Sequence, residues 1–137
     1  MSPDHVPMYR SEALWQILKD LRESQQGIQA AVILSVEGLL VEAYPSDNSE
    51  DSHINPTSSP QVAAMASVMA GLSRRTLDRL AQGELERLMV QGEEGVLLIY
   101  PCGRNFLAVL VEKDTRLGPV ITEMNAKTPR IKEVLEG

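Results

Sequence analysis

The segment 60–82 has the hydrophobic pattern of a helix with two faces to bury. Its first stripe is mostly bulky and apolar, and consists of Val62, Met65, Ala66, Met69, Leu72, Thr76, Leu77 and Leu80. A second stripe consists of the small residues Ala63, Ser67, Ala70 and Gly71, and Arg74 and Arg75 follow it. A surface helix of a monomer would carry charged residues on that second side. The pattern therefore predicts that the small stripe packs against a partner helix; the alternative is a helix buried wholly within its own domain.

The rest of the pattern predicts a helix and a hairpin before this central helix. Ser11 is the expected N-cap of the first helix, and Gly27 suits its C-terminal end. Two apolar segments, 30–34 and 39–43, flank Gly38, which supplies the positive φ that a tight hairpin with a bulge requires. These signals predict a first α-helix followed by a β-hairpin.

Three more strands and a last helix are predicted after the central helix. The segments 85–91, 96–100 and 106–111 are joined by short turns and predict an antiparallel meander. An amphipathic segment follows as the last helix, and Pro129 is expected to bend or split it. The predicted order is α-β-β-α-β-β-β-α.

Several of these strands are apolar without alternation, which indicates that both faces of the sheet are covered. The fold class predicted is therefore α/β, a three-layer α/β/α sandwich around a five-stranded antiparallel sheet. The central helix is expected on one face and the two terminal helices on the other.

The segment 44–59 interrupts this pattern with serines, prolines and acidic residues, and predicts a mobile acidic loop. His53 lies within it, but no cysteine or second histidine is nearby to complete a metal site, so a solvated charge run is the better interpretation. We expect residues 1–10 to form a flexible N-terminus and residues 11–137 to form one domain.

Composition narrows the function classes. The chain has 137 residues and a formal net charge of −6, which argues against a nucleic-acid partner because phosphate binding needs clustered Lys and Arg. No apolar run reaches the roughly 18 residues of a membrane span. The one cysteine, Cys102, permits no internal disulfide, which favours a cytoplasmic protein.

No arrangement of residues predicts catalysis, a metal site or a cofactor. The chain lacks the Gly-rich loop with Lys and Ser/Thr that cradles phosphates, so it is not itself a GTPase. His5 and His53 lie in segments that could not hold a base in position, and Cys102 in a predicted turn reads as an incidental thiol. Arg74 and Arg75 have two open interpretations: an electropositive patch for a partner, or cations that complement the helix dipole. We therefore expect a protein that is not an enzyme.

Three segments resemble those of a known family. They are the hairpin VILSVEGLLVEA with its Ser-x-Glu-Gly-Leu turn, the small-residue helix VAAMASVMAGLSRRTLDRL, and the hairpin GVLLIYPCGRNFLAVLVEKDTRLG. Together with the order of elements, these segments resemble the Roadblock/LC7 domain, and the resemblance covers roughly residues 11–136. The long acidic loop and Pro129 depart from the family's compact pattern.

The resemblance implies a dimer and a GTPase partner. Roadblock domains form homodimers or heterodimers through the central helix and the edge strand after it, and serve as platforms for Ras-like small GTPases or as light chains in motor complexes. MglB-type members are partners of MglA-type GTPases, and some stimulate hydrolysis without inserting an arginine. When the interface positions of the family are transferred to this sequence, the dimer or partner interface would contain Ala63, Ser67, Ala70, Gly71, Arg74, Arg75, Leu88 and Val90.

Three hypotheses for function follow. The first is a non-catalytic homodimeric regulator or scaffold for a Ras-like, MglA-type small GTPase. The second is a structural adaptor or light-chain-like subunit without a GTPase partner. The third is a ligand-sensing module, which the mostly aliphatic predicted core disfavours because a sensor needs a cavity with convergent polar groups.

Overall fold

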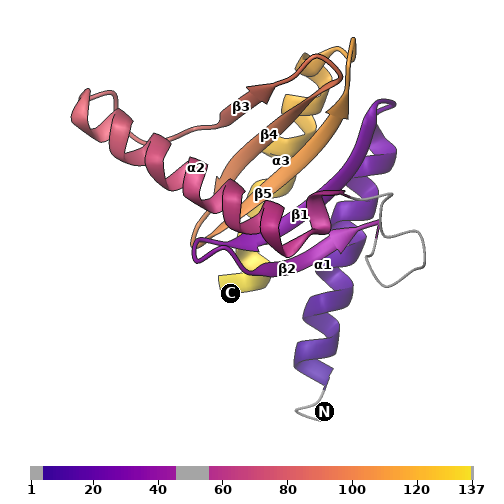
Figure 1. The fold of residues 1–137 in the computed structure, drawn as a ribbon. Helices are drawn as coiled ribbons and strands as arrows, with labels where there is room; N and C mark the ends of the chain where they lie inside the picture. Colours follow the sequence, from indigo (N-terminus) through magenta and orange to yellow (C-terminus); the bar gives the residue numbers. More distant parts are fainter. Residues whose placement is uncertain (1–4, 46–55, 137) are drawn as a thin grey trace.

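A computed structural model describes residues 5–45 and 56–136. Its five strands form one antiparallel sheet in the order β2-β1-β5-β4-β3 (Figure 1). The strands are β1 (Ile28–Ser35), β2 (Leu40–Tyr44), β3 (Leu88–Gln91), β4 (Gly95–Cys102) and β5 (Asn105–Glu112). The helices are α1 (His5–Ser24), α2 (Pro60–Arg79), α3 (Leu117–Glu136) and the 3-10 turn η2 (Pro56–Ser58). The predicted element order and fold class are confirmed.

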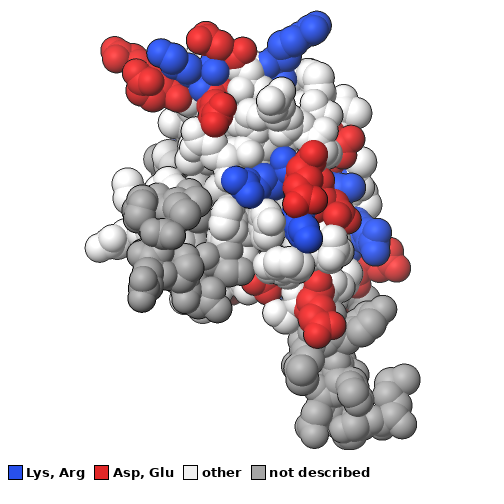
Figure 2. Space-filling view, turned by 90° about the vertical axis from the view of Figure 1, so that its right-hand side faces the viewer, with Lys and Arg blue, Asp and Glu red and all other residues white. Residues whose placement is uncertain are grey.

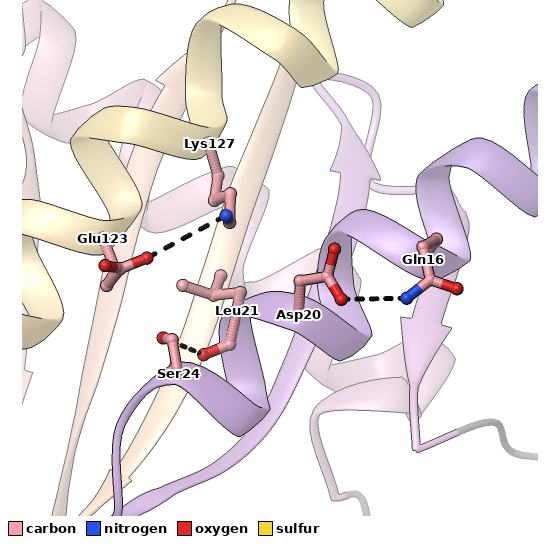
Figure 3. Close-up of polar contacts among 6 residues, drawn as sticks. All are labelled: Gln16, Asp20, Leu21, Ser24, Glu123 and Lys127. Atoms are coloured by element: carbon pink, nitrogen blue, oxygen red, sulfur yellow. Dashed lines mark hydrogen bonds and ion pairs between the residues drawn. The ribbon is translucent and has the colours of Figure 1, made fainter.

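Helices α1 and α3 lie side by side on one face of the sheet (Figures 1 and 3). They bury large aliphatic side chains against the strands; Leu18, Leu21, Ile33, Leu98, Leu107, Met124 and Ile131 are all fully buried there. Polar side chains of both helices bond locally: Gln16 donates to Asp20 at 2.8 Å, and Lys127 lies 3.9 Å from Glu123 (Figure 3). This face is closed by two helices.

Helix α2 covers the other face alone. It crosses the sheet obliquely from the β1 side, and its C-terminal turns project beyond the sheet next to β3 (Figure 1). Its core cluster is smaller and holds many alanines, together with Val32, Leu34, Ile99 and Phe106 from the strands. One helix that leaves the sheet before its end cannot cover the whole face.

The β1–β2 hairpin forms as predicted. Gly38 has a φ of 91°, and its N–H donates to the Ser35 carbonyl at 2.9 Å. The pairing register shifts between Ile33 and Leu34, which is the irregularity expected of a bulge.

Several boundaries differ from the predictions, and β3 begins at Leu88 rather than at residue 85. Ser11 lies inside α1 rather than at its cap, because the helix begins at His5; the Ser11 hydroxyl donates to Glu42 Oε2 at 2.8 Å. Helix α2 ends at Arg79, before residue 82. Pro129 does not split α3, which runs from Leu117 to Glu136. Pro129 has no N–H to donate to the Asn125 carbonyl, and this carbonyl accepts a hydrogen bond from the Thr128 hydroxyl at 3.4 Å instead.

The predicted acidic loop is only partly described. Residues 46–55, including His53, lie outside the described residues. At its C-terminal end, η2 contacts β1, β2 and β5 and buries Thr57 and Ser58. Both ends of the predicted loop therefore belong to other elements, since Tyr44 is the last residue of β2 and residues 56–58 form η2 on the sheet. The mobility of the segment stays a prediction.

Candidate interaction surface

Helix α2 places its small stripe on the side opposite to the one predicted. The small residues face the chain's own sheet: Ala63 is 1% exposed, Ala70 is fully buried, and Ser67 is buried beside them. The bulky residues Met65 and Leu72 are 62% and 55% exposed. Ala63, Ser67 and Ala70 therefore cannot reach a partner helix in this arrangement.

The physical reason lies in how closely the hairpin approaches α2. A Cβ placed on Gly38 would lie 2.8 Å from Ser67 Oγ and 3.1 Å from Ala64 Cα. Only small side chains on this stretch of α2 allow such a close approach. The small stripe is thus the mark of a tight contact within one chain.

The outward side of α2 carries a row of bulky apolar residues, which we call the outer row: Met65, Val68 and Leu72. They recur at helical spacing and are each more than half exposed, with Val68 at 63%. Exposed single apolar residues are common, but a contiguous row marks a surface that binds something. The sequence signal for the outer row is the bulk of Met65 and Leu72, which belong to the first predicted stripe, whereas Val68 lies outside both predicted stripes.

A groove separates the C-terminal half of α2 from the edge strand β3. It has a volume of about 470 Å³ and is lined by Met69, Leu72, Ser73, Thr76, Leu77, Leu85, Arg87, Leu88 and Val90. Met89 and Val90 on β3 are also substantially exposed. Strand β3 pairs with β4 on one side only and stands at the end of the sheet order. The groove and the edge together form an apolar surface that runs on from the outer row through Leu72.

The remaining predicted interface residues lie at different positions on this surface. Leu88 and Val90 line the groove. Gly71 is half-buried, and a Cβ added to it would meet nothing within 4 Å. The guanidinium of Arg74 lies 4.8 Å from the centre of the buried Phe106 ring, so this cation is held on its own core, whereas Arg75 is exposed.

Metal ligands and the single cysteine are the remaining candidates for chemistry. Within 5–45 and 56–136, no group of three His, Cys, Asp or Glu residues could hold a metal ion. Cys102 is the last residue of β4 and is buried, which corrects its expected place in a turn. Burial raises the pKa of its thiol to about 12; Glu136 adds to the rise and Lys132 opposes it.

Charge on the α1 side of the molecule is mixed. Figure 2 shows acidic and basic side chains interspersed there, without a large surface of one sign. Among the residues that the structure describes, no helix is long and apolar enough to cross a membrane.

A comparison with family models matches residues 14–112 to the Roadblock/LC7 domain. The chain belongs to the Roadblock/LC7 family. This confirms the resemblance drawn from the two hairpins and the central helix. Members of this family are generally non-catalytic regulators or adaptors.

Individual relatives agree with the family assignment. The uncharacterized protein MJ0310 of Methanocaldococcus jannaschii is 29% identical over 117 residues, which cover 85% of this chain and 95% of that protein. A Roadblock/LC7 domain from Streptomyces avermitilis has a similar structure, with a TM-score of 0.78 and 22% identity over 90% of this chain and 98% of that one. The gliding protein MglB of Thermus thermophilus has a TM-score of 0.79 and 15% identity, covering 93% and 91% of the two chains. These structures share the Roadblock/LC7 fold of this chain.

Proposed function

We propose that this protein is a cytoplasmic, homodimeric and non-catalytic regulator or scaffold for a Ras-like, MglA-type small GTPase. The observation that carries the proposal is the apolar surface made by the outer row, the groove and the open edge of β3. Membership of the Roadblock/LC7 family supports the GTPase association.

The shape of the α2 side supports a dimer. The C-terminal turns of α2 project beyond the sheet near β3 (Figure 1), and an apolar groove lies beside them. If two β3 edges pair about a two-fold axis, the projecting turns of each α2 lie over the partner's sheet. Each copy then covers apolar surface that the other leaves open, as a self-complementary interface requires. Leu88, Val90 and Gly71 lie on or beside this proposed interface, and the outer row takes the place of Ala63, Ser67 and Ala70.

Light scattering tests the dimer. The wild type is expected to have twice the mass of one chain at about 50 μM, and Val68→Arg, which adds a charge to the outer row, is expected to shift it toward a monomer. Arg130→Glu on α3 is the matched control for a surface charge change, because Arg130 is exposed and α3 covers the opposite face of the sheet. A wild type that stays monomeric would remove the dimer from the proposal.

A regulator must distinguish the two nucleotide states of its GTPase. The switch segments of a Ras-like GTPase are ordered by the γ-phosphate, so a protein that binds them has higher affinity for the GTP form. Equal affinity for both forms could not regulate the GTPase. Purified MglA-type GTPases loaded with GDP or a non-hydrolysable GTP analogue should therefore differ in affinity for this protein. Identical binding to both forms would favour the structural adaptor.

The arginines of α2 allow a test of mechanism. Arg74 is held over Phe106, and Arg75 is exposed on the same helix. We propose that neither acts as an arginine finger, so Arg75→Ala should lower any stimulated hydrolysis less than about tenfold. A loss of about a thousandfold or more would identify a finger supplied in trans.

A further inference from the structure

The open edge of β3 has charged residues of opposite sign at its two ends. Arg87 directly precedes the strand Leu88–Gln91, and Glu93 lies in the turn that follows it. Within the part of the chain that the structure describes, neither residue has an ion-pair partner, whereas the neighbouring Glu94 lies 3.7 Å from Lys113. The two charges lie too far apart along one strand to pair with each other, but they would approach each other between two antiparallel copies.

Arg87 points to a defined face of the sheet. Its guanidinium donates to Tyr100 Oη at 3.4 Å and lies 6.0 Å from the ring centre. Tyr100 belongs to the core cluster under α1 and α3. Met89 and Gln91 pair with Leu98 and Val96 of the same core cluster, so they share this face, although Arg87 also borders the groove.

Two-fold symmetry limits the possible registers. An axis that pairs the same edge strand antiparallel stands perpendicular to the sheet, so each face continues as the same face in the partner. Residues directly opposite each other must therefore share a face, and the axis passes midway between the two copies of one β3 residue, which lie directly opposite each other. The candidate centres are the four residues of β3.

Charge distinguishes among these centres. A pair centred on Met89 sets Arg87 opposite the partner's Gln91 and diagonal to the partner's Glu93, a separation that a long side chain spans. A pair centred on Val90 sets Arg87 directly opposite the partner's Glu93, although it also sets Glu86 opposite the partner's Glu94. A centre at Leu88 moves Arg87 away from that carboxylate. A centre at Gln91 leaves Arg87 diagonal to the partner's Glu93, but it would set Arg87 opposite Gly95, which belongs to β4 and lies past the turn.

We infer that Arg87 of one copy pairs with Glu93 of a second copy across joined β3 strands, and that these two symmetric ion pairs select the register of the dimer. The inference rests on the proposed homodimer. The apolar surface of the groove and outer row supplies the affinity, and the ion pairs hold the strands at the centre on Met89 or Val90.

Charge reversal tests the inference by sedimentation equilibrium of the full chain. Arg87→Glu and Glu93→Arg are each expected to raise the dimer dissociation constant about tenfold, because each places like charges together at both symmetric contacts between the paired β3 strands. Arg130→Glu makes the same charge change on α3 and should dimerise as the wild type does. The wild-type dimer should also weaken as salt concentration rises.

Mixing the two variants separates pairing from a structural role of either residue. In a heterodimer of Arg87→Glu with Glu93→Arg, both contacts again join opposite charges, so native mass spectrometry should show an excess of heterodimer. The double variant R87E/E93R should recover wild-type dimer affinity. Variants that dimerise like the wild type, without excess heterodimer, would overturn the ion pair and leave the dimer standing. A monomeric wild type would overturn both.

Discussion

The two faces of the sheet hold their helices with side chains of different size. Under α1 and α3, large residues such as Leu18 and Met124 fill the space between two helices and the strands. Under α2, alanines meet the sheet, and the helix turns the large residues of the outer row outward. Burying large side chains contributes most of the stability, so we assign stability to the first face and binding to the second.

The largest expected effect is a difference in unfolding free energy between arginine substitutions on the two sides of α2. Ala70→Arg places a charge against the chain's own sheet and should cost about 3–5 kcal/mol of unfolding free energy. Val68→Arg places the same side chain on the outer row and should change the stability of the single chain by less than about 0.5 kcal/mol. Urea unfolding at several protein concentrations separates this intrinsic effect from lost dimerisation. Equal destabilisation by both variants would contradict the observed orientation of α2.

The next largest effect is a difference in unfolding free energy between two leucine-to-alanine variants, one on each face of the sheet. Leu18→Ala removes a fully buried side chain under α1 and should cost about 2–5 kcal/mol. Leu72→Ala removes an exposed one and should leave the unfolding free energy of the monomer nearly unchanged while weakening self-association. Thermal unfolding and light scattering of both variants measure the two quantities. A stable Leu18→Ala protein would show that the closed face is less tightly packed than described.

A smaller effect concerns pH. The Cys102 thiol ionises in the unfolded chain near its ordinary pKa of 9.0, whereas burial raises its pKa in the folded chain to about 12. The contribution of this thiol to the unfolding free energy is fully present below the pKa of the unfolded chain. It is lost as the pH rises toward the pKa of the folded chain, because the unfolded chain then binds fewer protons than the folded chain. Between pH 9.0 and about 10, stability should fall by about 1 kcal/mol more than in Cys102→Ala. Equal pH slopes would show that solvent reaches the thiol.

The smallest effect is expected in the segment before α2. Replacing residues 46–55 with a short Gly/Ser linker should change the unfolding free energy by less than about 0.5 kcal/mol, given their polar composition. The control is Ser58→Asp, which buries a carboxylate at η2 and should destabilise the protein. A loss of several degrees in Tm from the linker alone would show that this segment contributes to the fold.

Periodicity and turn residues were sufficient to predict the fold. The continuous apolar strands indicated a sheet covered on both faces, and Gly38 located the hairpin. Burial of Thr57 and Ser58 could not be predicted, because local composition does not record the contacts of η2 with three strands. The N-terminal extent of α1 was missed because Ser11 has the chemistry of a cap but donates to Glu42 on β2.

The candidate surface was harder to predict than the fold. The central helix was correctly singled out as having two apolar faces, but hydrophobic size suggested the wrong face for the core. Ala63 and Ala70 face inward because the β1–β2 hairpin and sheet lie very close to α2, a distance set by tertiary structure. Arg87 was overlooked, because its significance depends on its position at the end of an edge strand.

The alanines under α2 also bear on how such proteins diversify. Because the fold depends on the inward alanines, positions 65, 68 and 72 can change without altering the scaffold. After gene duplication, a few substitutions there could give each copy its own partner while both keep the same stability. Orthogonal pairs could be engineered by the same route, with the outer row varied and the alanines left unchanged.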